Sequence, residues 1–459
     1  MSKLVIIGGG PAGYVAAIVA AQQGEQVILV EQKSLGGTCL NEGCMPTKSF
    51  LESAGIYSKV KNAEKFGVQL DSTSVSINWS QVLSYKNDIV KKLVNGIGYL
   101  MNKNKINVII GAASFITSHR LLVDKGDSIE EIDADKVIIA AGSEPIQLPF
   151  ARFDGEWIID SRQALNLSSI PKSIIIIGGG VIGCEFASIY SRMGTKVTIV
   201  EMANQLLPGE DPDIVSFLTQ ELEEAGVKIY TEAALKHVNR GLKEVTIQQR
   251  GENMTFNGDY VLVSVGRKPR VNELGLEKIG VSFCEKGIHV NENMQTSYSH
   301  IYACGDVIGG IQLAHVAFHE GTVAANHACG HETAVNYQAV PRCIYTAPEI
   351  ASVGLTEKEA KREYHDVKIG EFPFAANGKA LILNEQNGKV KIMIEPEYQS
   401  IIGVSIIGPR ATELIGQATL MLHTELTVDV LENFVAAHPS LGEAVQEAIL
   451  GSVGQTVHF

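Results

Sequence analysis

One unit occurs twice in this chain and constrains its fold more than any other feature. Residues 3–31 and 172–201 each contain a β-branched run, a glycine-rich turn, a helical stretch and a second β-branched run that ends in glutamate. The offset from the first glycine of the turn to the final glutamate is 23 positions in both copies. A strand–helix–strand unit repeated in register predicts two dinucleotide-binding modules.

Three glycines in each turn have separate roles in such a module. The first permits a tight turn, the second lets the backbone approach a pyrophosphate, and the third lets the helix pack on its strand. The phosphate then lies at a helix N-terminus, and the glutamate can accept hydrogen bonds from a ribose diol. A single motif could be only a glycine-rich turn, but two in register argue against that. The positions are Gly8, Gly10, Gly13 and Glu31 in the first copy and Gly178, Gly180, Gly183 and Glu201 in the second.

The two modules imply two different cofactors. Glu201 would repel a 2′-phosphate, and the stretch EMANQLLPGED holds no arginine to attract one, so the second module is predicted to bind NAD. The first module runs directly into a segment with two cysteines. A cofactor that remains there and exchanges electrons with sulfur is predicted to be a flavin, FAD.

Length and charge narrow the class of protein. A chain of 459 residues is too long for one ordinary core, so about three domains are expected. The net charge of −13 argues against a nucleic-acid or anionic-membrane surface. No apolar run approaches about twenty residues and the N-terminus has no signal-peptide pattern. We therefore expect a cytoplasmic protein without membrane insertion.

Further apolar runs complete the predicted sheets. Residues 135–145 and 259–269 each resemble a strand that closes a dinucleotide module, one after each repeat. Asp306 lies just past another strand, where it can reach a ligand at the carboxyl edge of a sheet. From about residue 340 the pattern becomes that of an α+β domain. The predicted fold class is α/β, with two Rossmann-like domains and a C-terminal α+β domain.

The stretch GGTCLNEGCMPTK, residues 36–48, contains two of the seven cysteines, and the sequence alone leaves three roles open for them. A zinc site needs about four ligands, and no further Cys or His lies near in sequence. A structural disulfide would close a very short loop and is disfavoured in a reducing compartment. A redox pair accounts for the neighbours best. Pro46 suits a first helical turn, which would place Cys44 at a helix N-terminus that stabilises a thiolate, with Lys48 one turn on.

These segments, together with IYACGD and AAHPSLGE, resemble the pyridine nucleotide-disulfide oxidoreductases in the same order, over essentially the whole chain. The resemblance is strongest for the branch that oxidises protein-bound dihydrolipoamide to lipoamide and reduces NAD+ to NADH. Enzymes of that branch are the third component of 2-oxoacid or acetoin dehydrogenase complexes. The stretches IGGIQLAHVAFHEG, PRCIYT and GEFPFAANGKA resemble the acetoin-complex version. A lipoyl-bearing acyltransferase is the partner that this implies.

The resemblance implies domain limits and further cofactor contacts. We expect an FAD-binding domain over 1–147, an NAD-binding domain over 148–270, completion of the FAD domain over 271–340 and a dimerisation domain over 341–459. The FAD contacts implied are Gly8, Gly10, Pro11, Ala12, Gly13, Glu31, Gly37, Thr38, Lys48, Ala112, Gly142, Ser143, Asp306, Leu313, Ala314 and His315. The NAD contacts implied are Gly178, Gly180, Val181, Ile182, Gly183, Glu201 and Gly266.

The same resemblance assigns roles in the redox segment. Cys39 is implied to exchange with the substrate disulfide and Cys44 to face the flavin as a thiolate. Lys48 is implied to approach the flavin and to pair with Glu185 on the helix of the second module. Without the family match, this lysine and this glutamate would as readily be solvated surface residues.

The stretch HPSLGE supplies His438 and Glu443, which resemble the catalytic pair of the family. A dithiol must lose protons to attack a disulfide, and an imidazole whose other nitrogen faces a carboxylate is a suitable base. In this family the pair acts on the disulfide of the other subunit, which implies a homodimer. The family usually has His, Thr and Ser where this chain has Ala436, Ser440 and Gly442, so substrate contacts are expected to differ.

Two rival functions follow from the same residues. The first is an enzyme of this fold with another acceptor, such as a mercuric, glutathione-like or coenzyme-A-disulfide reductase. Val181 stands where glutathione-reductase relatives carry a gating tyrosine, and Glu201 disfavours NADPH, so both weigh against it. The second rival is a non-catalytic flavoprotein that acts as a redox sensor or scaffold. The complete set of Cys, His and Glu weighs against that one.

A histidine-rich stretch, HVAFHEGTVAANHACGHE, has the i,i+4 spacing of metal ligands. Its two histidine pairs lie twelve residues apart, so they need not converge. We expect helix packing rather than a metal site. The residues are His315, His319, His327, Cys329 and His331.

Overall fold

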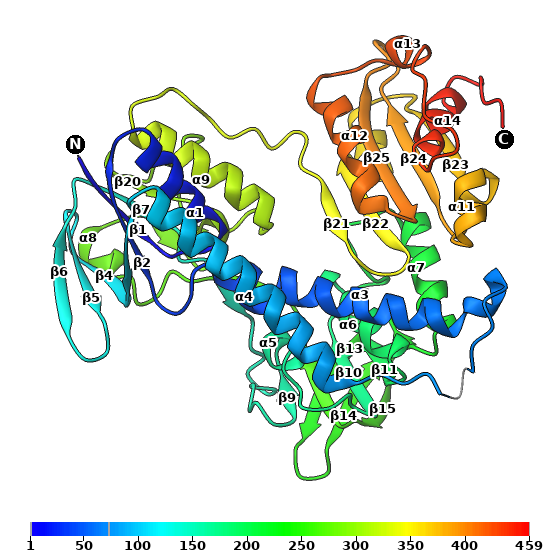
Figure 1. The fold of residues 1–459 in the computed structure, drawn as a ribbon, viewed down its shortest axis with the longest axis horizontal. Coiled ribbons are helices and arrows are strands. Elements are labelled where there is room, and N and C mark those ends of the chain that lie inside the picture. The colour runs from blue at the N-terminus through cyan, green and yellow to red at the C-terminus, as the bar shows by residue number, and fades with distance from the viewer. Residues whose placement is uncertain (1, 72–73, 459) are drawn as a thin grey trace.

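The computed structural model describes residues 2–71 and 74–458. Three sheets organise the chain, as Figure 1 shows: the first lies at the left, the second at the lower centre and the third at the upper right. Two long helices, α3 (Cys44–Lys61) and α4 (Trp79–Lys103), run from the first sheet toward the second. The arrangement confirms the predicted α/β fold class.

The first sheet is parallel and has the strand order β20-β7-β1-β2-β3. The edge strand β20 comes from a segment that follows the whole second module in sequence, so the chain returns to this sheet to complete it. Helices α1 (Pro11–Gln22) and α9 (Ala314–Ala328) pack side by side on one face. The strands are β1 (Lys3–Ile7), β2 (Gln26–Glu31), β3 (Asn107–Ile110), β7 (Lys136–Ile139) and β20 (Ile301–Ala303).

The second sheet repeats this topology in the order β12-β11-β10-β16-β9, again all parallel. Its outer strand β9 precedes the module in sequence, whereas β20 follows the first module. Helices α6 (Val181–Arg192) and α7 (Pro212–Glu224) belong to this body. The strands are β9 (Ile158–Ile159), β10 (Ser173–Ile177), β11 (Lys196–Val200), β12 (Lys228–Tyr230) and β16 (Tyr260–Val263).

Alternate side chains of each first strand enter two different cores. Leu4 and Ile6 face the helices, whereas Val5 packs with a three-stranded antiparallel meander on the opposite face. A strand buried on both faces reads as a continuous apolar run, which explains KLVII and SIIII. The meanders lie at matching places in the two modules: β4 (Ala112–Thr117), β5 (Arg120–Asp124) and β6 (Ile129–Asp133), and β13 (Ala233–Asn239), β14 (Glu244–Gln249) and β15 (Glu252–Asn257).

A short antiparallel pair connects the two modules. Strand β8 (Ser143–Pro145) leaves the first module and pairs with β17 (Arg267–Pro269), which returns from the second. Both chain crossings therefore lie side by side. The shorter helices are α2 (Gly37–Glu42), α5 (Ser161–Ala164), α8 (Leu276–Ile279), α10 (Glu357–Glu363), α11 (Gly378–Leu383) and α13 (Val428–Leu431).

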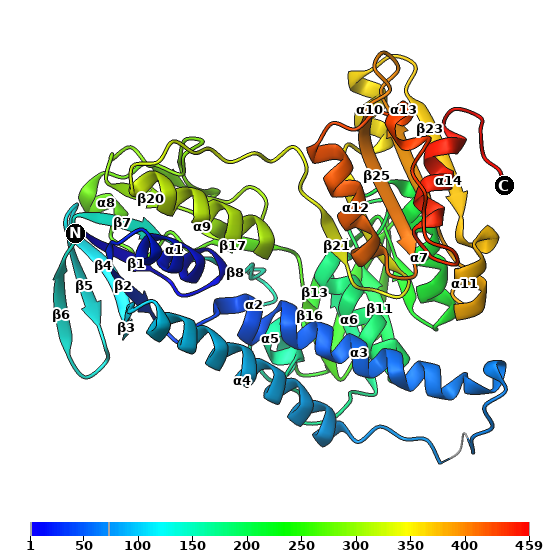
Figure 2. The ribbon, with the colours of Figure 1, turned by 45° about the horizontal axis from the view of Figure 1, so that its top comes forward.

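The third sheet is antiparallel, with the order β21-β22-β25-β24-β23. Helices α12 (Ala411–His423) and α14 (Glu443–Gly451) cover it, as Figure 2 shows. One face of this sheet packs in its own core with α12 and α14, whereas Ile344, Ile350 and Ile407 on its strands belong to the core of the second parallel sheet. The strands are β21 (Arg342–Ile344), β22 (Glu349–Gly354), β23 (Lys368–Pro373), β24 (Lys389–Ile394) and β25 (Ile401–Gly408). Among the described residues, no helix is long and apolar enough to span a membrane.

Candidate active site

The two glycine turns have nearly the same backbone. Gly8 and Gly178 adopt φ of +103° and +106°, a region that favours glycine. The residues that cap helices α1 and α6 share φ −74° and ψ −172°. A Cβ at Gly13 would lie 1.8 Å from the carbonyl oxygen of Gly8, and one at Gly183 would lie 2.0 Å from that of Gly178. No side chain caps the N-terminus of either helix, so the backbone N–H groups there are available to a bound pyrophosphate.

The glutamate that ends each second strand folds back onto its own turn. Glu31 accepts hydrogen bonds from the N–H of Gly9 at 2.7 Å and of Lys33 at 2.8 Å. Glu201 accepts them from Gly179 at 2.6 Å and from Ala203 at 2.7 Å. Each carboxylate oxygen retains a free lone pair for a ribose hydroxyl. The residues present therefore fit a dinucleotide in both modules.

One cleft of about 1720 Å³ runs past both turns and collects nearly all of the predicted cofactor residues. The cysteine segment also lines the cleft. So do residues of β21 and α12, which belong to the third sheet and its helices and are called the third body below. Gly13 and Gly183 lie beneath their turns rather than on the wall. Ala112, which begins β4, is not among the lining residues, but the N–H of its neighbour Gly111 donates to the carbonyl oxygen of Glu31 at 2.9 Å. A cleft of this size exceeds the usual volume of about 300–1,000 Å³ for one drug-sized ligand, as two dinucleotides require.

The cysteine pair lies on the short helix α2 and at the start of the long helix α3, beside this cleft. Cys39 is in α2, and Cys44 begins α3 after Gly43. Both are free thiols, and Cys39 is 7% exposed. A hydrogen bond between the two sulfurs lowers the pKa of Cys44 to about 7, with Lys48 adding to the effect, although burial opposes it. The same hydrogen bond and burial raise the pKa of Cys39. The surroundings of the two sulfurs therefore differ, and they favour the thiolate form at Cys44 over Cys39.

Lys48 and Glu185 form the predicted pair between the two modules. Lys48 Nζ lies 2.9 Å from each carboxylate oxygen of Glu185, which is 3% exposed. The backbone N–H of Tyr345 donates to Glu185 Oε1 at 3.0 Å, and its ring centroid lies 4.5 Å from Lys48 Nζ. Tyr345 is a residue that the sequence alone did not single out.

Asp306 lies in a short 3₁₀ turn, η2 (Gly305–Ile308), beside the strands that connect the modules. Ser143 Oγ donates to its carboxylate, and Arg267 Nε donates to Ser143 Oγ at 2.8 Å. Arg267 Nε also lies 3.9 Å from Asp306 Oδ2. Arg267 was not predicted, although the run DYVLVSVGRKP that contains it was recognised as closing a module. Its side chain therefore connects the second module to the aspartate of the first.

His315 and His327 of α9 have local partners. His315 Nε2 bonds to the carbonyl oxygen of Pro341 at 2.8 Å, and burial lowers the pKa of this histidine. His327 Nδ1 bonds to the hydroxyl of Tyr302 at 3.0 Å. Leu313 caps the helix and, like Ala314, lines the cleft. His315 also lines the cleft, where it is predicted to contact the flavin, whereas His327 packs against Tyr302.

His438 and Glu443 form their predicted contact but lie outside the cleft. His438 Nδ1 is 2.8 Å from Glu443 Oε1, and the N–H of Ser440 donates to Glu443 Oε2 at 2.7 Å. Burial acts to raise the pKa of Glu443, but the hydrogen bonds from Ser440 and His438 lower it. The His438 side chain is 78% exposed. A single chain therefore does not bring this pair to its own cysteines.

The contact between His438 and Glu443 is present although three nearby positions differ from the usual family residues. These positions are Ala436, Ser440 and Gly442. Ser440 supplies a backbone N–H, which any residue provides. Gly442 is the residue that caps α14, and Ala436 N–H donates to Gln446 Oε1 at 3.3 Å.

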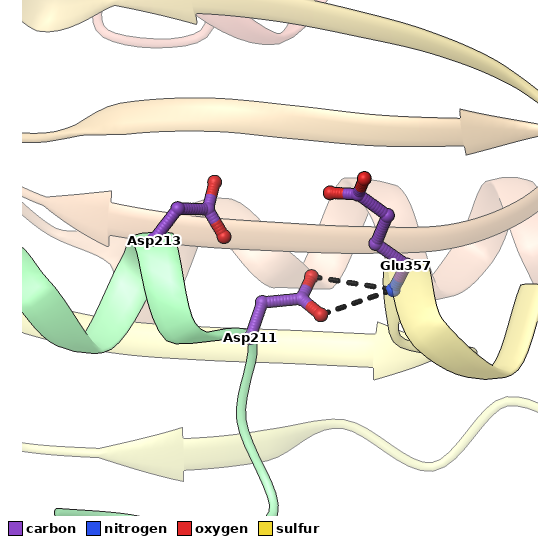
Figure 3. Close-up of side chains that lie close together, drawn as sticks. All are labelled: Asp211, Asp213 and Glu357. Atoms are coloured by element: carbon purple, nitrogen blue, oxygen red, sulfur yellow. Dashed lines mark hydrogen bonds between the residues drawn. The ribbon is translucent and has the colours of Figure 1, made fainter. Parts of the chain in front are cut away.

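Another acidic cluster lies outside the cleft. Asp211, Asp213 and Glu357 converge from α7 and α10, as Figure 3 shows. The Nζ of Lys391 lies 2.9, 2.6 and 3.0 Å from their carboxylates, and its side chain is 0% exposed. The ammonium therefore occupies the place that a metal ion would need. This cluster joins the second module to the third sheet.

Comparison with known proteins defines the class to which this site belongs. Residues 2–321 match the family described as pyridine nucleotide-disulphide oxidoreductase, and residues 340–449 match the dimerisation domain of that family. The chain belongs to the pyridine nucleotide-disulphide oxidoreductase family. Membership confirms the predicted FAD and NAD, whose binding the two glycine turns fit.

Relatives with high sequence identity are named dihydrolipoyl dehydrogenase, and solved structures of the same fold include a flavoprotein disulfide reductase. A dihydrolipoyl dehydrogenase of Bacillus subtilis is 54% identical over 99% of both chains. A dihydrolipoyl dehydrogenase of Geobacillus stearothermophilus is 41% identical over 100% of this chain and 97% of its own. LpdA of Mycobacterium tuberculosis superposes with a TM-score of 0.91 at 30% identity, over 98% of this chain and 99% of its own. The HOCl-induced flavoprotein disulfide reductase RclA of Escherichia coli superposes with a TM-score of 0.85 at 28% identity, over 97% of this chain and 99% of its own.

Proposed function

We propose that this protein oxidises dihydrolipoamide carried on an acyltransferase subunit and reduces NAD+ to NADH, as a component of a 2-oxoacid or acetoin dehydrogenase complex. The observation that carries the proposal is the position of the cysteine pair, in one cleft between two dinucleotide turns. The relatives named dihydrolipoyl dehydrogenase, which match the chain from end to end, support the substrate. A cytoplasmic location is part of the same proposal.

The chain's own residues carry out the thiol exchange. The exposed imidazole of His438, held by Glu443, takes a proton from one thiol of the substrate. The resulting thiolate attacks Cys39 of the oxidised pair, which breaks the disulfide and releases Cys44 as a thiolate. The second substrate thiol then attacks the mixed disulfide, so that lipoamide leaves and Cys39 is reduced. FAD held in the cleft beside Cys44 and Lys48 would supply the two-electron transfer between the reduced cysteine pair and NAD+.

The domain limits complete the proposal. We assign residues 1–147 and 271–340 to the FAD domain, because β20 and α9 of the second segment pack with the sheet and helix of the first. Residues 148–270 form the NAD domain. Residues 341–459 form the dimerisation domain, which overlaps the family match at 340–449.

The active site is proposed to be completed by a second copy of the chain. The match of residues 340–449 to a dimerisation domain supports a homodimer, and His438 is exposed away from its own cleft. The test mixes subunits that carry Cys39→Ser with subunits that carry His438→Gln. If the histidine acts across the interface, mixed dimers regain one working site; if it acts within its own chain, mixing restores nothing.

The substrate is tested by steady-state assay of the purified holoenzyme. We expect turnover of dihydrolipoamide with NAD+ and little reduction of glutathione disulfide with NADPH. Negligible dihydrolipoamide oxidation beside robust turnover of another disulfide would overturn the assignment. The backbone contacts of Glu201 favour the NAD-linked reaction, because its carboxylate is fixed where a 2′-phosphate would lie.

A further inference from the structure

Tyr345 follows strand β21 of the third body and reaches the redox centre of the same chain. Its ring lies over Lys48 Nζ, 4.5 Å from the centroid, and its N–H donates to Glu185 Oε1 at 3.0 Å. Lys48 is one helical turn past Cys44, and Glu185 belongs to α6 of the second module. One residue of the third body therefore contacts both members of the ion pair beside the cysteines.

The Lys48 ammonium has two neighbours of different kinds. The carboxylate of Glu185 holds it from one side through both oxygens at 2.9 Å. The face of the Tyr345 ring attracts it through the ring quadrupole from another side. Burial raises the pKa of Tyr345 to about 12, with smaller contributions from nearby thiol and carboxyl groups, so the phenol is neutral. The ring therefore acts through its π face and not through a phenolate charge.

The position of this ammonium matters to the flavin-facing sulfur. Cys44 is faced by Cys39 from α2, Lys48 from its own helix and Glu185 from α6. Asp306 from η2 acts on Cys39, and Cys343 from β21 lies near Lys48. Lys48 favours the Cys44 thiolate, whereas Glu185 opposes it. The balance depends on where the ammonium lies between the carboxylate and the sulfur, and on how much water screens it.

We propose that Tyr345 is a positioning residue for the redox pair: its ring holds the Lys48 ammonium beside Cys44 and so stabilises the Cys44 thiolate. The inference rests on the proposed role of Cys44 as the flavin-facing sulfur, but not on dihydrolipoamide as the substrate. The residue acts through Lys48, because its N–H bond to Glu185 is a backbone contact that any side chain retains.

The test titrates the long-wavelength absorbance of Cys39→Ser holoenzyme, in which Cys44 is the only sulfur of the pair. No substrate is present, so a wrong substrate assignment leaves this result intact. Tyr345→Phe keeps the ring face, and its midpoint should match that of the Cys39→Ser parent. Tyr345→Leu removes the ring, and we expect the midpoint to rise by about half a pH unit, the size of one lost cation–π contact.

Two further variants keep the test decisive if Tyr345→Leu folds poorly. Mono- and trifluorinated phenylalanine at position 345 preserve the shape and weaken the quadrupole stepwise, so the midpoint should rise with each step. In a Lys48→Met background the Phe-to-Leu exchange should move the midpoint no further. An unchanged midpoint in the fluorinated series, or an equal shift without Lys48, overturns the proposal. Absence of the band in the Cys39→Ser parent overturns both the role of Cys44 and this inference.

Discussion

The two dinucleotide modules have nearly the same glycine-turn geometry, but different segments of the chain pack against them. Their first glycines differ in φ by only 3°, from +103° to +106°, and their glutamates bond to equivalent backbone groups. Outside the turn, the first module continues into the cysteine segment and receives α9 and β20 from far along the chain. The second receives Lys391, Arg342 and Tyr345 from the third body.

The difference indicates that binding a dinucleotide and using it are separable properties of this fold. The βαβ turn creates the anion site through backbone geometry alone, so duplication preserves it. The redox cysteines follow the first module in sequence. The groups that position Lys48 beside them are Glu185 of the second module and Tyr345 of the third body. Glu185 of the second module and Cys44 of the first face each other through Lys48, which shows how the modules act together.

The sharpest test of this equivalence replaces the third glycine of each turn by alanine. The new Cβ would lie 1.8 Å from a carbonyl oxygen in Gly13→Ala and 2.0 Å in Gly183→Ala, so each helix must move. We expect Gly13→Ala to be purified without flavin and inactive. Gly183→Ala should retain its flavin and its reduction by dihydrolipoamide with an artificial acceptor, while NAD+ reduction is lost. Absorbance at the flavin band and the two assays separate these outcomes, and loss of flavin from both variants would contradict separate sites.

The next largest effect is expected at Lys391 and its three carboxylate partners, which connect the second module to the third body. Lys391→Met leaves three carboxylates without their buried cation, which should cost about 3–5 kcal/mol of unfolding free energy. Because these carboxylate oxygens lie within 4.8 Å of one another, Ca²⁺ should raise the Tm of the variant but not that of the unmodified protein.

A matched control for this cluster lies in the first module. Lys136 lies 3.2 Å from Glu25 and is partly exposed, so Lys136→Met should cost about 1 kcal/mol or less. Thermal unfolding with and without Ca²⁺ gives both values. Equal losses in the two variants would show that the Lys391 cluster is no more than a surface pair.

A smaller effect is expected from the glutamates that end the second strands. Glu201→Gln removes the charge that accepts two backbone hydrogen bonds and faces the ribose, so the KM for NAD+ should rise about 10- to 100-fold. Glu31→Gln should weaken flavin retention and leave the KM for NAD+ unchanged. Isothermal titration with NAD+ and flavin release on dilution measure the two effects. A rise in the KM for NAD+ in Glu31→Gln would show that the modules do not bind independently.

The smallest effects are expected in the pH titration of Cys44, first in the unmodified protein and then in one variant. The pKa of Cys44 is lowered to about 7, below the ordinary thiol value of 9.0, so the thiolate prevails above pH 7 and is protonated below it. The long-wavelength band of the reduced holoenzyme should fall about twofold between pH 8 and pH 7. Glu185→Gln removes a charge that raises this pKa, and its midpoint should therefore move lower. An upward shift would mean that Glu185 acts mainly by holding Lys48.

Sequence patterns identified the elements whose roles depend on local spacing. The turn glycines, their glutamates and the HPSLGE contact all lie as the residue offsets predict, because each is set within a few dozen neighbouring residues. Arg267 and Tyr345 were missed, since their partners lie 124 and 160 positions away. No spacing rule connects residues that meet only when separate bodies pack.

The sequence by itself therefore determined two nucleotide modules, a cysteine pair and a histidine–glutamate contact. The sequence also predicted Cys44 as the thiolate, whereas only the tertiary structure brings Lys48 and Glu185 together from different helices beside that sulfur. The tertiary structure also decided that His438 lies exposed and outside the cleft. Local backbone geometry is encoded in residue spacing, whereas electrostatic environment is set by whichever groups the packed chain brings within a few ångströms.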